Sequence, residues 1–379
     1  MDFNKIIKKF ILIIFFFMIL NKINIYASEN IYNSHEYNKQ FKISGADKLK
    51  EKLPENILKS LEDFGIYDNN ILKITNINIE KIIIFVKNSL KEKIKTPLKI
   101  IASVMGIILI SIFLKSFIPI HSGSNYENIF NKINTCLIIL ILLTPILYFV
   151  KYISVTLRCA SGFVLCFAPI ISGIGIATGK PIVSASYGAI MACGCQNIYN
   201  WSEKIFENFF EILLGISIIS AINLEVKFNK ICDLFYKFLL FSLSFISIIF
   251  TSLISWQNLV SNSLRNTSEK SIKFLFNIVP LIGGILGEAS TGVAACLDIL
   301  KSTVGVFGMI SVSVIFLPPI IECAVWILSI NICVFLSESF SISNISVLLN
   351  LCEKVIKILF AFLIFSLTVF ILCTTLILK

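Results

Sequence analysis

The sequence predicts an all-α fold: a polytopic helical membrane protein with a cleavable signal peptide and a short exported helical region at its N-terminus. Two observations indicate the membrane class. Of the 379 residues, 56% are hydrophobic and the mean hydropathy is +0.87, whereas soluble chains are about 45–50% apolar. Apolar runs at 133–150, 238–254 and 355–378 approach the roughly 20 residues that cross a bilayer. Because the runs do not alternate in polarity as barrel strands do, helices are expected.

Residues 1–27 have the features of a secretory signal peptide. The basic stretch MDFNKIIKK precedes an apolar core, FILIIFFFMIL, and Ala27 offers a small residue before a cleavage point at Ser28. The core is too short to span a bilayer as a helix. A short uncleaved anchor is the alternative interpretation. We expect the chain from Ser28 onward to begin outside the cytoplasm.

Residues 28–97 are more polar, and they predict an extracytoplasmic helical region. One helix is expected to begin at Pro54 and to end at Gly65. A second, from about Ile79 to Lys95, has an apolar stripe surrounded by lysines. Such a basic amphipathic helix suits the membrane surface. Packing on the first helix, as a small two-helix domain, is equally compatible with the sequence.

Residues 98–379 are expected to form a multi-pass transmembrane domain. Ten apolar segments are candidates, and because several are short or interrupted, we expect about seven to nine spans. Lysines flank many segments on both sides, so the charge bias does not orient them.

The net charge of +10 does not indicate a nucleic-acid partner. Only two of the 33 basic residues are arginines, and no basic patch with interleaved aromatic residues occurs. Lysines beside apolar segments fit a chain whose partner is the lipid bilayer. The eleven cysteines lie between Cys136 and Cys373, and CGC at 193–195 lacks CxxC spacing. We therefore interpret them as packing residues and expect neither a metal site nor a cofactor.

The stretch NIVPLIGGILGEASTGVAACLDILKSTVGVFG, at 277–308, places charges among glycines and apolar residues. It is not a phosphate-binding loop, because Leu300 stands where that motif needs glycine before the lysine. As a helix, its small and polar residues form a seam that allows a close helix approach. Such a seam is expected to face the protein interior, and a conduit lining or a re-entrant segment are the alternatives. The seam comprises Pro280, Gly283, Gly284, Gly287, Glu288, Thr291, Asp298 and Lys301.

Within the seam, Asp298 and Lys301 have the spacing of an ion pair on one helix. No nucleophile–base set accompanies these residues, so no catalytic site is expected.

A second segment repeats part of this pattern. PIISGI at Pro169–Ile174 resembles PLIGGI at Pro280–Ile285, and Gly173 corresponds to Gly284. Paired proline and glycine interruptions in two halves of a chain mark the central site of some transporters. An internal repeat therefore stays open, as does a self-contained secondary transporter with a midplane site at the Pro169 and Pro280 helix breaks.

The order of these features resembles that of the stage III sporulation protein AE family of spore-forming Firmicutes. The motifs that carry the resemblance are RNTSEKSIKF, VPLIGG, Glu288 and LKSTVGVFG, between Arg265 and Gly308. The resemblance implies a non-enzymatic membrane component of a channel or secretion complex that links mother cell and forespore. It also implies a requirement for forespore development and for late forespore transcription after engulfment.

The same resemblance implies partners and a location. The partners would be the other membrane proteins of the stage III sporulation operon, including a ring-forming component and an ATPase, and the forespore protein Q across the intermembrane space. The location would be the mother-cell membrane that surrounds the forespore.

Overall fold

The computed structural model describes residues 35–63, 79–115, 124–178, 181–204, 206–222, 230–250, 252, 283–340 and 342–378. Within these residues all regular secondary structure is helical and no strand occurs. The predicted all-α fold is confirmed for this part of the chain. The predicted signal peptide, residues 1–27, lies outside it.

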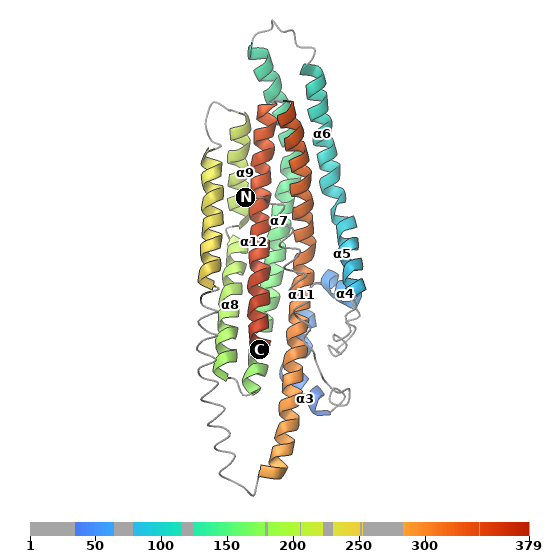
Figure 1. Cartoon of the computed structure of the whole chain (residues 1–379), viewed down its shortest axis with the longest axis vertical. Helices are drawn as coiled ribbons and strands as arrows, with labels where there is room; N and C mark the ends of the chain where they lie inside the picture. Colours follow the sequence, from blue (N-terminus) through green and yellow to red (C-terminus); the bar gives the residue numbers. More distant parts are fainter. Residues whose placement is uncertain are drawn as a thin grey trace.

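Long helices lie side by side and run alternately up and down (Figure 1). We call the end where α7 is followed by α8 the lower end, and the end where α11 is followed by α12 the upper end. The helices are α7 (Ser124–Ala177), α8 (Pro181–Lys204), α9 (Phe206–Ile222), a helix over Lys230–Phe250, α11 (Gly283–Ser339) and α12 (Ser343–Leu378). The core lies where α7, α8, α11 and α12 meet, and aromatic rings such as Phe163, Phe307 and Phe370 are buried there.

Helices α7 and α11 are much longer than the sequence segments from which they were expected. The predicted segments 133–150 and 161–177 both lie in α7, and 304–317 and 320–336 both lie in α11. Prolines fall inside these helices without ending them, including Pro169, which was expected to break α7. A proline removes one backbone hydrogen bond, and helices continue past such a loss when neighbouring helices pack around it.

Five helices in the described residues are long and apolar enough to cross a membrane. A sixth is counted if α8 and α9, which meet at a 48° bend, form one span. This number is below the expected seven to nine because several apolar segments share one helix. Residues 253–282 lie outside the description, so the number for the whole chain stays a prediction.

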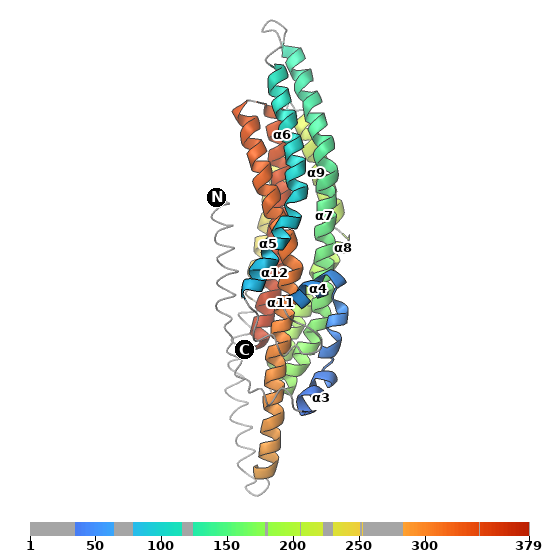
Figure 2. The ribbon, with the colours of Figure 1, turned by 90° about the vertical axis from the view of Figure 1, so that its right-hand side faces the viewer.

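The N-terminal region is built from short helices: α3 (His35–Ile43), two 3-10 turns, η1 (Ala46–Lys48) and η2 (Lys50–Lys52), and α4 (Glu55–Asp63). Gly45 joins α3 to η1 with a φ of 73°, a left-handed conformation that favours glycine. Helix α4 begins directly after Pro54, as predicted, whereas the predicted end at Gly65 is not described. The apolar residues of this region are buried. Its helices lie beside the lower parts of α11 and α7 (Figure 2).

The amphipathic helix α5 (Ile79–Lys93) runs almost directly into α6 (Lys95–Lys115). Backbone hydrogen bonds from Ile94 to Leu90 and from Leu98 to Ile94 carry the helical pattern across the junction. Pro97 lies in the first turn of α6, where its missing N–H is tolerated. Helix α5 packs mainly on α11, and its position along the membrane surface stays a prediction.

Candidate functional site: a polar layer across the helix bundle

Near the middle of α7, polar and charged residues from four helices make two contacts about 9 Å apart along the helix axis. We call this set the polar layer; it consists of Lys93, Tyr152, Arg158, Glu207 and Glu322. The Lys93 ammonium on α5 lies 3.7 Å from Glu322 Oε2 on α11. The same nitrogen lies 4.5 Å from the centroid of the Tyr152 ring on α7, so a carboxylate and an aromatic face share one cation. This contact joins α5, α7 and α11.

Aromatic side chains pack next to the Lys93–Glu322 contact, on the side of the upper end. Trp326 follows Glu322 by four residues and therefore lies on the same face of α11. Its ring is buried and lies 6.3 Å from that of Phe149 on α7. The side chain of Glu322 is only 13% exposed, whereas that of Lys93 is 29% exposed. The carboxylate is therefore the more enclosed partner.

On the opposite side of α7, side chains of α7 contact the end of α8 and the beginning of α9, where these two helices are interrupted. The last residues of a helix leave carbonyl oxygens without partners, and the buried Ser154 hydroxyl donates to the Ser202 carbonyl at 2.8 Å. Arg158 lies 3.6 Å from Glu207, which is in the first turn of α9, where the helix dipole favours a carboxylate. Helix α7 thus supplies partners to both sides of the break.

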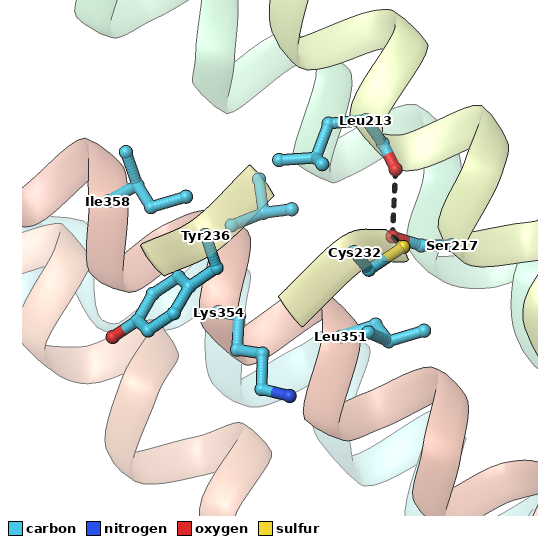
Figure 3. A pocket seen from close by; sticks show the side chains of 8 residues that line it. Leu213, Ser217, Cys232, Tyr236, Leu351, Lys354 and Ile358 are labelled. Atoms are coloured by element: carbon cyan, nitrogen blue, oxygen red, sulfur yellow. Dashed lines mark hydrogen bonds between the residues drawn. The ribbon is translucent and has the colours of Figure 1, made fainter. Parts of the chain in front are cut away.

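A small pocket lies nearer the upper end, between α9, α12 and the helix over Lys230–Phe250 (Figure 3). An ion pair between Lys354 and Asp233 lies beside it. The Ser217 hydroxyl donates to the Leu213 carbonyl of its own helix at 2.8 Å and lies 3.9 Å from Cys232 Sγ. The pocket has room for about one water molecule. Its polar groups therefore stabilise helix packing.

The described sequence-predicted site residues belong to two helices, α7 and α11. Pro169 and Gly173 lie on an exposed face in the lower part of α7. Pro280 falls outside the described residues. Five others belong to helix α11, but the structure does not describe their side chains; these are Gly283, Gly284, Gly287, Glu288 and Thr291.

Asp298 and Lys301 occupy different environments. The Asp298 side chain is exposed, although the seam was expected to face the protein interior. Lys301 is buried, and so are the neighbouring apolar residues Leu300 and Val304. An ion pair between Asp298 and Lys301 stays a prediction.

The sequence analysis missed the residues that make the closest helix contacts. A Cβ atom added to Gly188 on α8 would lie 1.9 Å from Ser172 Oγ on α7, and one added to Gly175 would lie 2.2 Å from Ser184 Oγ. A Cβ atom added to Gly308 on α11 would lie 2.4 Å from the Phe167 ring. Small residues in apolar segments were the available signal, but only contacts between segments show which of them meet.

The polar layer was also missed. Its charges are isolated in the sequence, and isolated charges in apolar segments are themselves a signal of buried pairing. Within the described part of the chain, no group of three or more His, Cys, Asp or Glu residues is arranged to hold a metal ion.

Comparison with known proteins identifies one family. A family model described as stage III sporulation protein AE matches residues 66–379. The matched region contains every helix from α5 to α12, and α3 and α4 precede it. No curated protein and no solved structure matches the chain.

Proposed function

We propose a function from one premise: the chain belongs to the stage III sporulation protein AE family. It is therefore a protein of sporulation stage III, and its long apolar helices indicate a multi-pass membrane protein. The proposed function is that of a non-enzymatic membrane component of the channel or secretion complex that links mother cell and forespore. Its role is to support forespore development and late forespore transcription after engulfment.

The use of polar groups in the bundle supports a structural role. Lys93, Arg158 and Lys354 each contact a carboxylate on a different helix. Ser154 and Asn344 donate hydrogen bonds to backbone carbonyls of other helices. Side chains used in this way fix the arrangement of helices, as a component of a larger assembly requires.

The proposed partners are the other stage III sporulation operon membrane proteins, with the ring-forming component and the ATPase among them, and the forespore protein Q across the intermembrane space. The proposed location is the mother-cell membrane around the forespore. In this arrangement the ATPase supplies the energy, and the present chain supplies membrane-embedded structure.

The alternative of a self-contained transporter is not favoured. It relied on helix breaks at Pro169 and Pro280, and α7 continues through Pro169 to Ala177. Pro169 and Gly173 also lie on an exposed face of α7, away from the buried core.

The test is deletion of the gene in its own host, followed by microscopy and a reporter of late forespore transcription. We expect forespores that complete engulfment, then shrink and leave the reporter silent, and we expect the intact gene to restore the reporter. Normal spores from the deletion strain would overturn the proposal. Recovery of the ATPase and the ring-forming component with an affinity-tagged chain, after cross-linking in sporulating cells, tests the partners separately.

A further inference from the structure

We propose that the bilayer surrounds only the upper half of the bundle. The lower half begins below the polar layer, and together with α3 and α4 it is surrounded by water. This inference concerns the position of the protein in the membrane and does not depend on which complex the protein joins.

Helix length gives the first reason. At 1.5 Å per residue, the 54 residues of α7 extend about 80 Å and the 57 residues of α11 about 85 Å. The hydrocarbon core of a bilayer is about 30 Å thick. Tilting does not remove so large a difference, because spanning helices tilt by about 20° on average. More than half of each helix must therefore lie beyond the hydrocarbon core.

The polar layer fixes where the lower boundary lies. It is near the middle of α7, and the exposed lysines Lys151 and Lys204 accompany it on α7 and α8. A bilayer centred on the bundle would enclose these charges at its midplane, where charged side chains are rare. A bilayer around the upper half encloses the Lys354–Asp233 pair, in which each charge has a partner. The exposed Glu211 and Lys237 then lie near its lower surface, where long side chains reach the headgroups. Placing the polar layer at a membrane surface puts both lysines beside lipid headgroups.

Exposed side chains decide which half is embedded. Above the polar layer, large apolar residues face outward on several helices; examples are Phe113, Leu140, Ile219, Ile332 and Phe335. The exposed face of α8 below the layer instead carries alanine, cysteine and amides; examples are Ala189, Cys193, Gln196 and Asn197. Lipid tails favour the first surface, and water favours the second.

Three places show the limits of the apolar surface. Ile84 and Leu90 on α5, below Lys93, are exposed, and so is Ile176 at the end of α7. The helix over Lys230–Phe250 reaches below the polar layer, because the Phe250 ring lies 3.1 Å from a Cβ atom built on Gly194. The embedded surface is therefore lower on the side of this helix.

The N-terminal helices provide an independent reason. Helices α3 and α4 lie beside the lower part of α11 (Figure 2). Their apolar residues are buried there, and the Tyr37 hydroxyl lies 3.2 Å from Thr303 Oγ1. Their outer surfaces expose charges, including Lys39, Lys42 and Glu62. Two amphipathic helices with a charged outer face require water at the level where they pack.

Two native cysteines provide the test. Cys136 and Cys193 are the exposed residues among the ten cysteines whose side chains are described. Cys136 lies on α7 above the polar layer, and Cys193 lies on α8 below it. The experiment labels the full chain in open membrane fragments, where both membrane surfaces are accessible, with a sulfonated maleimide that does not enter lipid. Mass spectrometry then measures modification at each cysteine.

We expect Cys193 to react faster than Cys136 by on the order of tenfold or more, because maleimide needs a hydrated thiolate. Both should react after the protein is unfolded in detergent. Cys193→Ser and Cys136→Ser confirm the assignment. A second pair, Ala189→Cys and Leu140→Cys, repeats the comparison on the same two helices. Equal labelling of the upper and lower positions, or protection of Cys193 until unfolding, would overturn the inference whatever the sporulation phenotype.

Discussion

At the level of single residues, glycine sets how closely the helices approach. Gly308 leaves no space for a side chain, because a Cβ atom there would lie 2.4 Å from the Phe167 ring. Gly162 on α7 is also in a helix interior, but a Cβ atom there would meet nothing within 4 Å. The two positions therefore separate the effect of helix propensity from the effect of packing.

Gly308→Ala is expected to destabilise the protein by about 1–3 kcal/mol, because the ring or the helix must shift to accept the methyl group. Gly162→Ala, the control, is expected to be neutral or to stabilise by up to about 1 kcal/mol through better helix propensity. Thermal unfolding of both variants in one detergent measures the difference. An unchanged melting temperature for Gly308→Ala would contradict the close contact with Phe167.

The pair formed by Lys93 and Glu322 predicts an asymmetric response. Lys93→Ala strands the more enclosed carboxylate, whereas Glu322→Ala leaves a lysine that can extend toward water. Because the pair is partly exposed, we expect Lys93→Ala to cost about 1–3 kcal/mol and Glu322→Ala to cost less. The double variant should be more stable than Lys93→Ala alone. Thermal unfolding of the four proteins measures this order, and the opposite order would show that the pair does not control stability.

At the level of elements, the break between α8 and α9 depends on α7. Ser154→Ala removes the donor to the Ser202 carbonyl in a buried place. The expected loss is about 1–3 kcal/mol, the cost of an unsatisfied buried group. Ser103→Ala is the matched control, because the exposed Ser103 hydroxyl bonds only to Lys99 of its own helix. Hydrogen exchange of α8 and α9 should rise only in Ser154→Ala; equal exchange in both variants would show that Ser154 does not hold the break.

The elements also show what the sequence could and could not predict. Hydrophobicity correctly indicated the helical fold of the described residues, and Pro54 correctly indicated the start of α4. It divided α7 and α11 too often, because prolines and short polar interruptions look like ends when only local sequence is considered. Whether α7 continues through the exposed Pro169 depends on the packing of its other faces against α8, α11 and α12, and those contacts are distant in sequence.

The same reasoning applies to the candidate site. Lys93, Tyr152 and Glu322 are far apart in the chain, and each alone resembles a charge or an aromatic residue near a segment end. Only the up-and-down arrangement of the helices brings them to one level. Asp298 was expected inside the bundle from its spacing with small residues, yet it is exposed. Helical spacing identifies a face but does not say what that face contacts.

At the level of the whole molecule, the proposed membrane position predicts where a new charge is tolerated. Leu140 is 71% exposed above the polar layer, and Ala189 is exposed below it. Leu140→Lys should reduce the amount of inserted protein, because lysine near the middle of a spanning helix costs roughly 2.5–3.5 kcal/mol. Ala189→Lys should insert at the level of the unchanged protein. Equal insertion, measured by membrane fractionation and immunoblotting, would contradict the proposed position.

The alternating direction of the helices determines on which side of the membrane a reporter fused to the end of the chain would lie. Helix α12 descends from the upper end past the polar layer, so its last residues lie at the end of the bundle where α3 and α4 pack (Figure 1). A fusion after Lys379 therefore shares a compartment with the N-terminal helices. If residues 28–97 are exported, alkaline phosphatase fused there is active, and a fluorescent protein that matures only in the cytoplasm stays dark. The reverse pattern would place α3 and α4 in the mother-cell cytoplasm.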